Sequence, residues 1–219
     1  MASAGTDDAL DDVRAQKKVI RKEIRAAMKT ISAEDIEIQS AMVWDRLVQM
    51  DQYKNAVSVG LFLSMPTNEI DTSLILKKAI ERDDKTVYVP RVGLDFEKCD
   101  MDLIKAETKD ADDVWDQWPR NKWNIPEPPA HFDCVAGPGD IDLLVVPGVC
   151  FDDRGGRLGQ GKGYYDRFIA KMKAGGETKP LLVAVGLAPQ FVGDRHVPMH
   201  EHDFSMNMLV LPESTHDFS

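Results

Sequence analysis

The sequence has little cysteine, no long apolar run and no excess of basic residues, and each absence excludes a class of protein. Its three cysteines, Cys99, Cys134 and Cys150, are odd in number and widely spaced, which excludes a disulfide framework and a CxxC metal site. No apolar stretch approaches the roughly 20 residues of a membrane-spanning helix. The net charge of −10 disfavours nucleic acid and anionic membranes as partners. These absences favour a small-molecule partner.

The N-terminal segment also lacks the features of a targeting signal. MASAGTDDALDD has no basic n-region and no apolar h-region, so we expect no signal peptide and a cytoplasmic protein. Residues 1–11 are small, polar and acidic, which predicts a disordered tail. With 219 residues and 43% hydrophobic content, the chain suits one α/β domain over residues 12–219.

The chain is organised around a glycine-rich stretch between an expected strand and an expected helix. Residues 141–146 form the apolar run of a buried central strand, and residues 164–172 place apolar and aromatic side chains at helical spacing. Six of the fifteen glycines lie between Gly148 and Gly163. In such an arrangement backbone N–H groups and a helix N-terminus bind phosphate, and glycine allows the close approach. The stretch therefore favours a phosphate site.

From residue types alone, alternatives to this interpretation stay open. Residues 156–162 satisfy GxxxxGK, but Gly163 stands where a P-loop needs Ser or Thr, and GQGKG at 159–163 is not GxGxxG. The same residues fit a hairpin turn at 153–156 followed by a surface loop. The cations Arg157 and Lys162 favour phosphate binding over that alternative.

Residues 13–28 predict an amphipathic helix with one basic face. Its apolar stripe contains Ile20 and Ile24, and its basic face carries Lys17, Arg21 and Arg25 at four-residue spacing. Such a face is most often only solvated. In an acidic chain, however, several cations gathered on one helix are what an oligophosphate site requires.

Other elements follow from periodicity and turn residues. We expect helices beginning at Ser32 and Asp71, strands at 56–63, 86–89, 181–185 and 208–211, an edge strand at 101–105, and a long loop at 124–140. Ligands of open α/β sheets bind beyond the carboxyl ends of strands. Glu69 and Arg91 follow two of these strands, which makes Glu69 a binding candidate and Arg91 a phosphate candidate.

Two further clusters each allow two interpretations. The first consists of Trp115, Trp118 and Trp123. These rings either cover the edge of the core or form an aromatic wall for a flat ligand. The second consists of His196, His200, Glu201, His202 and Asp203. It is either an ordered loop or a transition-metal site, although its spacing fits no HExxH or Cys/His pattern.

In six stretches the sequence resembles the 5-formyltetrahydrofolate cyclo-ligases, also called 5,10-methenyltetrahydrofolate synthetases. The most specific stretch is GRLGQGKGYYD at 156–166. The supporting stretches are KKVIRKEIR at 17–25, FLSMPTNEID at 62–71, VYVPR at 87–91, WNIPEP at 123–128 and DLLVVPGVCFD at 142–152. They occur in family order, and the resemblance runs from about residue 13 to residue 212.

The resemblance implies an ATP- and magnesium-dependent ligase of one-carbon metabolism. In this family the γ-phosphoryl group of ATP passes to the formyl oxygen of 5-formyltetrahydrofolate. A neighbouring folate amine then attacks the activated carbon, and the products are 5,10-methenyltetrahydrofolate, ADP and phosphate. Because the nucleophile belongs to the substrate, catalysis depends on positioning and on charge screening. The implied fold is a single three-layer α/β domain with a mostly parallel open sheet, NagB/RpiA-like, and we expect a monomer.

The resemblance also implies roles for individual residues. The nucleotide-binding positions are Lys17, Lys18, Arg21, Arg157, Leu158, Gly159, Gln160, Gly161, Lys162, Gly163, Tyr164 and Tyr165. The positions next to the reacting groups are Lys162, Tyr164 and Arg157. The folate-binding positions are Leu63, Met65, Glu69, Trp123 and Tyr164, where Glu69 would accept N–H bonds from the pterin edge. The magnesium carboxylates are Asp166 and Asp203, whose hard oxygens suit this ion.

The sequence departs from the family pattern at three places. The loop before Glu69 is one residue longer than in some members, many members have Gly at the position of Lys162, and Asn207 stands where Asp is common. Two other functions therefore remain open. One is a non-catalytic relative that binds folate or nucleotide, for which Asn207 is the only support. The other is a sugar-phosphate isomerase or deaminase-like enzyme on a similar sheet.

Overall fold

The computed structural model describes residues 4–93, 100–106, 117–175 and 178–219, and only the backbone of residues 4–10. The helices are α1 (Ala4–Met28), α2 (Ala33–Gln49), α3 (Asp51–Asn55), α4 (Ser73–Glu81), α5 (Tyr164–Ala174) and the 3₁₀ helix η2 (Ala188–Gln190). The strands are β1 (Ser58–Gly60), β2 (Thr86–Val92), β3 (Met101–Lys105), β4 (Leu143–Val146), β5 (Cys150–Phe151), β6 (Arg157–Leu158), β7 (Leu181–Val185), β8 (Met208–Val210) and β9 (Thr215–Asp217). Cys99 and Trp115 lie outside the described residues.

Seven strands form one sheet in the order β3-β2-β1-β4-β7-β8-β9. The five central strands are parallel, and the outer strands β3 and β9 run antiparallel to their neighbours. The expected mostly parallel sheet is thus confirmed. β5 and β6 form a separate antiparallel hairpin, joined by a turn at residues 152–156.

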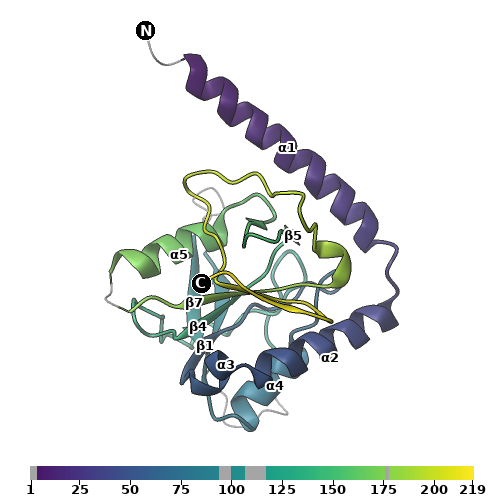
Figure 1. Cartoon of the computed structure of the whole chain (residues 1–219). Coiled ribbons are helices and arrows are strands. Elements are labelled where there is room, and N and C mark those ends of the chain that lie inside the picture. Colours follow the sequence, from purple (N-terminus) through teal and green to yellow (C-terminus); the bar gives the residue numbers. More distant parts are fainter. Residues whose placement is uncertain (1–3, 94–99, 107–116, 176–177) are drawn as a thin grey trace.

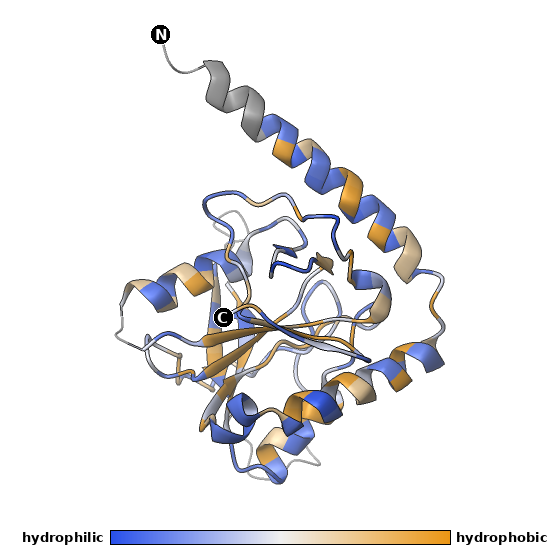
Figure 2. Ribbon diagram, viewed as in Figure 1, coloured by the Kyte–Doolittle hydropathy of each residue, from blue (hydrophilic) through white to orange (hydrophobic). Residues whose placement is uncertain are grey.

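Helices cover both faces of the sheet, which gives three layers (Figure 1). Side chains alternate along β4: Leu143 and Val145 pack with the apolar stripes of α1, α2 and α4, whereas Leu144 and Val146 pack with α5. Hydrophobic residues accordingly dominate the central strands in Figure 2. A strand buried on both faces carries an unbroken apolar run, as the sequence of β4 indicated.

β2 continues past Pro90 to Val92, although Pro90 was expected to end it. Tyr88 O accepts the N–H of Leu61, so Tyr88 faces β1. Backbone polar groups alternate in direction along a strand, and Pro90 therefore directs its nitrogen to the same side. β1 has already ended at Gly60, so the missing N–H of Pro90 leaves no strand carbonyl without a partner.

The N-terminal helix begins earlier than expected. The sequence predicted a disordered tail over residues 1–11, but α1 starts at Ala4. No proline interrupts this segment, and acidic residues suit a helix N-terminus. The helix therefore continues outward from the turns that Ile20 and Ile24 anchor in the core. Residues 1–3 lie outside the described part of the chain.

Candidate active site

A cavity of about 430 Å³ opens between the carboxyl ends of β1 and β4. The chain leaves β1 through α4 towards β2 and leaves β4 through α5 towards β7, so the connections diverge to opposite sides of this point. Such a switch point is where open α/β sheets bind ligands. The cavity is lined by residues that follow β1 and β4, by Pro90 and Val92 at the end of β2, by the Trp123 loop, and by residues between Arg157 and Asp166.

The glycine-rich loop leads directly into the N-terminus of α5. Gly161 has φ 101° and Gly163 has φ 69°, conformations that favour glycine. A Cβ on Gly161 would lie 3.3 Å from Cζ of Arg21. The helix N-cap is Gly163 itself, which has no side chain to cap the first turn. The N-terminus of this 11-residue helix thus lies at the rim of the cavity without a side-chain cap.

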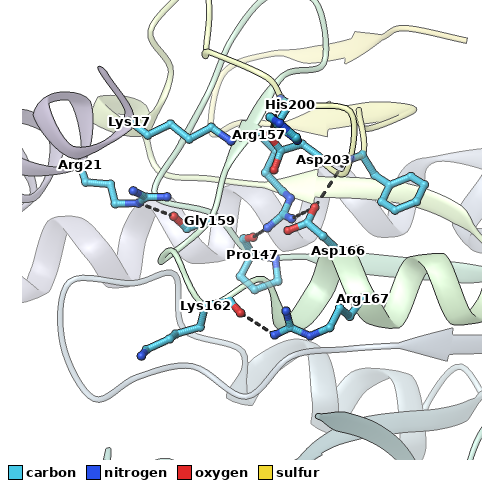
Figure 3. A network of polar contacts seen from close by, with 11 residues as sticks. Lys17, Arg21, Pro147, Arg157, Gly159, Lys162, Asp166, Arg167, His200 and Asp203 are labelled. Carbon is cyan, nitrogen blue, oxygen red and sulfur yellow. Dashed lines mark hydrogen bonds and ion pairs between the residues drawn. The ribbon is translucent and has the colours of Figure 1, made fainter. Parts of the chain in front are cut away.

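The structure brings the basic face of α1 onto this loop (Figure 3). Nε of Arg21 donates to Gly159 O at 2.8 Å, and Arg25 Nη2 donates to Gln160 Oε1 at 2.6 Å. Burial, and secondarily the charge of Arg25, lowers the pKa of Arg21. These cations repel each other where an anion would relieve the repulsion. Of this basic face, Arg25 lines the cavity, whereas Lys17 and Arg21 do not. Lys18 is exposed and does not line it either.

In the described structure, each of the two carboxylates expected to bind magnesium forms an ion pair with a basic side chain. Asp166 Oδ1 accepts Nη2 of Arg157 at 2.7 Å and the N–H of Phe204 at 3.3 Å. Asp203 Oδ2 forms an ion pair with Lys17 and accepts the N–H of His200 at 2.7 Å. The Asp166–Phe204 bond places the two carboxylates on adjoining segments (Figure 3).

Arg157 is the buried member of this network. Its side chain is only 3% exposed, and Nη1 donates to Pro147 O at 3.3 Å. Its Nε is buried without a hydrogen-bond partner among the described residues. A buried guanidinium with an unused donor is costly, which makes this position suited to an anionic ligand.

Glu69 occupies the apolar side of the cavity. Its Oε2 accepts the N–H of Met65 at 2.6 Å. Burial raises the pKa of Glu69 to about 7, against the opposing effect of the Met65 N–H. Asn68 has φ 59°, and this left-handed residue turns the longer loop so that Glu69 still lines the cavity. The extra residue therefore does not remove Glu69 from the site.

Apolar side chains complete this half of the cavity. Leu63 and Met65 line it from the β1 loop, and Trp123 lines it from the loop after residue 120. Trp118 is instead buried against Phe132, with ring centroids 5.9 Å apart. Of the two described tryptophans in the cluster, one thus covers the core and the other walls the cavity.

The remaining predicted residues differ in how they lie relative to the cavity. The side chain of Lys162 points away from the two carboxylates in Figure 3, while its carbonyl accepts Nη2 of Arg167 at 2.5 Å. Tyr164 and Tyr165 line the cavity at the start of α5, and burial and the nearby Glu69 raise the pKa of Tyr165. Arg91 does not line the cavity, and its Nη1 donates to Phe132 O at 2.9 Å; its role as a phosphate ligand stays a prediction.

The histidine cluster is only partly assembled. Potential ligand atoms of His200, Glu201 and His202 lie within 4.8 Å of one another on an exposed turn. His196 lies elsewhere, 3.8 Å from the carboxylate of Asp153. Asn207 is also removed from the metal carboxylates, because its Oδ1 accepts the N–H of Leu182 at 2.9 Å beside the start of β7.

Several cavity residues were missed from the sequence. Phe62, Val92, Ile125, Pro147 and Gly148 line the cavity. Three of them, Phe62, Pro147 and Gly148, come soon after β1 or β4. The rule that ligands bind beyond strand ends would have identified these three.

A model of the 5-formyltetrahydrofolate cyclo-ligase family matches residues 13–212. The chain belongs to this family. The cyclo-ligase of Mus musculus is 29% identical over 205 residues, covering 92% of this chain and 96% of the mouse protein. A cyclo-ligase of Arabidopsis thaliana, named as mitochondrial, is 28% identical over 221 residues and covers 94% and 77%.

A solved structure supports the fold. The NMR structure of the 5,10-methenyltetrahydrofolate synthetase of Aquifex aeolicus superposes with a TM-score of 0.73 at 24% identity, covering 92% of each chain. The fold described above is thus similar to that of the Aquifex aeolicus synthetase. Among the described helices, none combines the length and the apolarity that a bilayer crossing requires.

Proposed function

We propose that this cyclo-ligase family member converts 5-formyltetrahydrofolate to 5,10-methenyltetrahydrofolate, with ATP as phosphoryl donor and magnesium as cofactor. The observation that carries the proposal is one cavity whose halves differ in chemistry. One half is apolar around Glu69, and the other is lined by the glycine-rich loop, Arg157 and Asp166. Outside the lining, Arg21 contacts this loop and Lys17 pairs with Asp203. A flat heterocycle and an oligophosphate would meet between the two halves.

Glu69 and the apolar walls are proposed to hold the pterin. The ring is flat and presents adjacent N–H groups, which one carboxylate accepts in pairs. Leu63, Met65 and Trp123 supply apolar surface for its faces. Met65 N–H already binds Oε2 and so orients the carboxylate. In this proposal the substituents of the ring would extend towards the glycine-rich loop.

The nucleotide phosphates are proposed to lie on residues 157–165 and on the first turn of α5. Backbone N–H groups around Gly161 and Gly163 would bind phosphate oxygens, and Lys17 and Arg21 would neutralise their charge. Leu158 is buried at the base of this loop and supports it. A single charge-assisted hydrogen bond of this kind contributes about 1.5–3 kcal/mol.

The two carboxylates fit a magnesium ion. Both described bonds to Asp166 go to Oδ1 and both to Asp203 go to Oδ2, which leaves the other oxygen of each side chain for a ligand role. Magnesium prefers such hard oxygens and would neutralise charge on the phosphates. Arg157, buried beside Asp166, would add a fixed positive charge to the phosphoryl transfer.

Transfer of the phosphoryl group to the formyl oxygen releases ADP, and attack of the folate amine on the formyl carbon then releases phosphate. Both ligands supply the reacting atoms, so the protein positions them and screens their charge. Tyr164 is proposed to separate this region from water at the junction of the two halves. Lys162, at the rim, is proposed to contact the phosphates from outside.

A spectroscopic assay tests the proposal. Incubation with 5-formyltetrahydrofolate, ATP and Mg²⁺ should raise the near-ultraviolet absorbance of the methenyl product, with one ADP formed per folate converted. Binding of both ligands without absorbance change or ADP release would favour a non-catalytic relative. Asn207, the only support for that alternative, accepts the N–H of Leu182 with its Oδ1 at 2.9 Å.

The metal assignment has its own test. Asp166→Asn should raise the Mg²⁺ concentration needed for half-maximal activity, because the neutral amide is a weaker ligand. The measurement is a metal titration at saturating ATP and folate, with exposed Asp133 changed to Asn as control. An unchanged titration would remove Asp166 from the metal site.

A further inference from the structure

Asp152 is a buried carboxylate to which neither the family resemblance nor the proposed mechanism gives a role. It lies directly after β5 and is 2% exposed. Its Oδ1 accepts the N–H groups of Arg154 at 3.0 Å and Gly156 at 2.7 Å, which shapes the turn of the β5–β6 hairpin. Its Oδ2 accepts the N–H of Val197 at 2.8 Å, from a segment 45 residues away. One side chain therefore joins two loops.

Those two loops carry the proposed metal carboxylates or their partners. The hairpin turn ends at Gly156, immediately before Arg157, whose guanidinium holds Asp166. Val197 begins a segment, residues 197–206, that contains Asp203 and that we name the strap. Its far end returns to the same turn, because Met206 N–H donates to Gly155 O at 2.9 Å. The turn thus anchors both ends of the strap.

The anchoring is local and tight. A Cβ on Gly155 would lie 2.8 Å from Met206 O, and a Cβ on Gly156 would lie 2.4 Å from Asp152 Oδ2. The Met206 anchor is backbone to backbone, whereas the Val197 anchor uses the Asp152 side chain. A single substitution at Asp152 can therefore release the strap at Val197 without changing the residues proposed to touch a ligand.

We infer that Asp152 is a positioning residue, which holds the strap against the β5–β6 hairpin and so keeps Asp203 beside Asp166. In its metal-related part this inference rests on the proposed function. The carboxylate is needed because both of its oxygens accept N–H bonds. An amide has one acceptor side and one donor side, and in either orientation its NH₂ group faces an N–H donor. Asp152→Asn should thus break the link between the two loops.

The test compares Asp152→Asn with Asp142→Ala. Asp142 Oδ2 also accepts three bonds, from Val57 N–H, Ser58 N–H and Ser58 Oγ, but at the amino ends of β1 and β4. In hydrogen-exchange mass spectrometry, peptides covering 197–206 should exchange faster in Asp152→Asn and not in Asp142→Ala. The Mg²⁺ concentration for half-maximal cyclisation should rise about tenfold in Asp152→Asn only, with the folate KM unchanged.

Unchanged exchange of the strap in Asp152→Asn would overturn the inference, and so would a released strap with an unchanged magnesium titration. The exchange readout requires no turnover. Failure of the proposed function would appear instead as absent cyclisation by the wild-type protein. If Asp152→Asn does not fold, Gly156→Ala replaces it, because its Cβ would displace the Asp152 carboxylate while the charge is kept.

Discussion

Lys17 and Arg21 already contact groups of the site. Lys17 forms an ion pair with the carboxylate of Asp203, and Arg21 donates to the backbone carbonyl of Gly159. We expect Lys17→Ala or Arg21→Ala to raise the KM for ATP at least tenfold, because a charge-assisted bond to phosphate is worth about 1.5–3 kcal/mol. The KM for folate should change less than about twofold, because the folate half of the cavity lies beyond the glycine-rich loop. Initial-rate kinetics with each substrate varied separately measures this.

Lys22→Ala provides the control for these variants. Lys22 is exposed on the same helix, and its replacement removes one positive charge without removing a described contact of the site. An equal rise in both KM values for Lys17→Ala or Arg21→Ala would show that these residues only hold α1 in place.

The raised pKa of Glu69 predicts that folate binding depends on pH. With a pKa of about 7, its carboxyl is mostly protonated at pH 6 and mostly ionised at pH 8. Only the ionised form accepts two N–H bonds, so the KM for folate should be about tenfold higher at pH 6 than at pH 8. Glu69→Gln should have a raised KM that no longer varies over this range. A flat wild-type profile would contradict the role given to Glu69.

At the scale of elements, the glycine-rich loop depends on backbone conformations that other residues resist. Gly161→Ala should reduce kcat/KM for ATP at least tenfold, because Gly161 has φ 101° and its new Cβ would press on Arg21. Such backbone strain costs about 1–3 kcal/mol. Gly137→Ala is the control, since no atom lies closer than 3.4 Å to its added Cβ. Equal kinetics of the two variants would contradict the requirement for glycine at 161.

Elements with strong local signals could be predicted from the sequence. The apolar run of β4 and the Ser32 cap of α2, where Ser32 Oγ accepts Asp35 N–H at 3.0 Å, are both confirmed. Elements that depend on partners far along the chain could not. From the sequence alone, Pro90 predicts the end of a strand, because the sequence does not show that β1 stops at Gly60. The short strand β9 depends on its pairing with β8.

At the scale of the whole molecule, the site is made of segments that meet only in the folded chain. The loop between β6 and α5 could be predicted, because glycine spacing is local. The approach of Lys17 to Asp203, 186 residues later, and the bond from Asp152 to Val197 could not, because neither residue type specifies its partner. Sequence reasoning therefore named most of the candidate ligands but missed the contacts that position them.

This convergence predicts that nucleotide binding stabilises the whole fold. A ligand that bridges α1, the glycine-rich loop and the strap binds only when all three are assembled. At 100 times its Kd, ADP with Mg²⁺ should add about 2.7 kcal/mol to the free energy of unfolding. For a chain of this size that corresponds to a rise in Tm of about 5–10 °C, measured by differential scanning calorimetry. Lys17→Ala should lose about half of the rise at the same ADP concentration, because a tenfold higher Kd leaves only about 1.4 kcal/mol of stabilisation. If ADP and Mg²⁺ left the wild-type Tm unchanged while 5-formyltetrahydrofolate raised it, the nucleotide would not bridge these segments, and only the folate half of the site would stand.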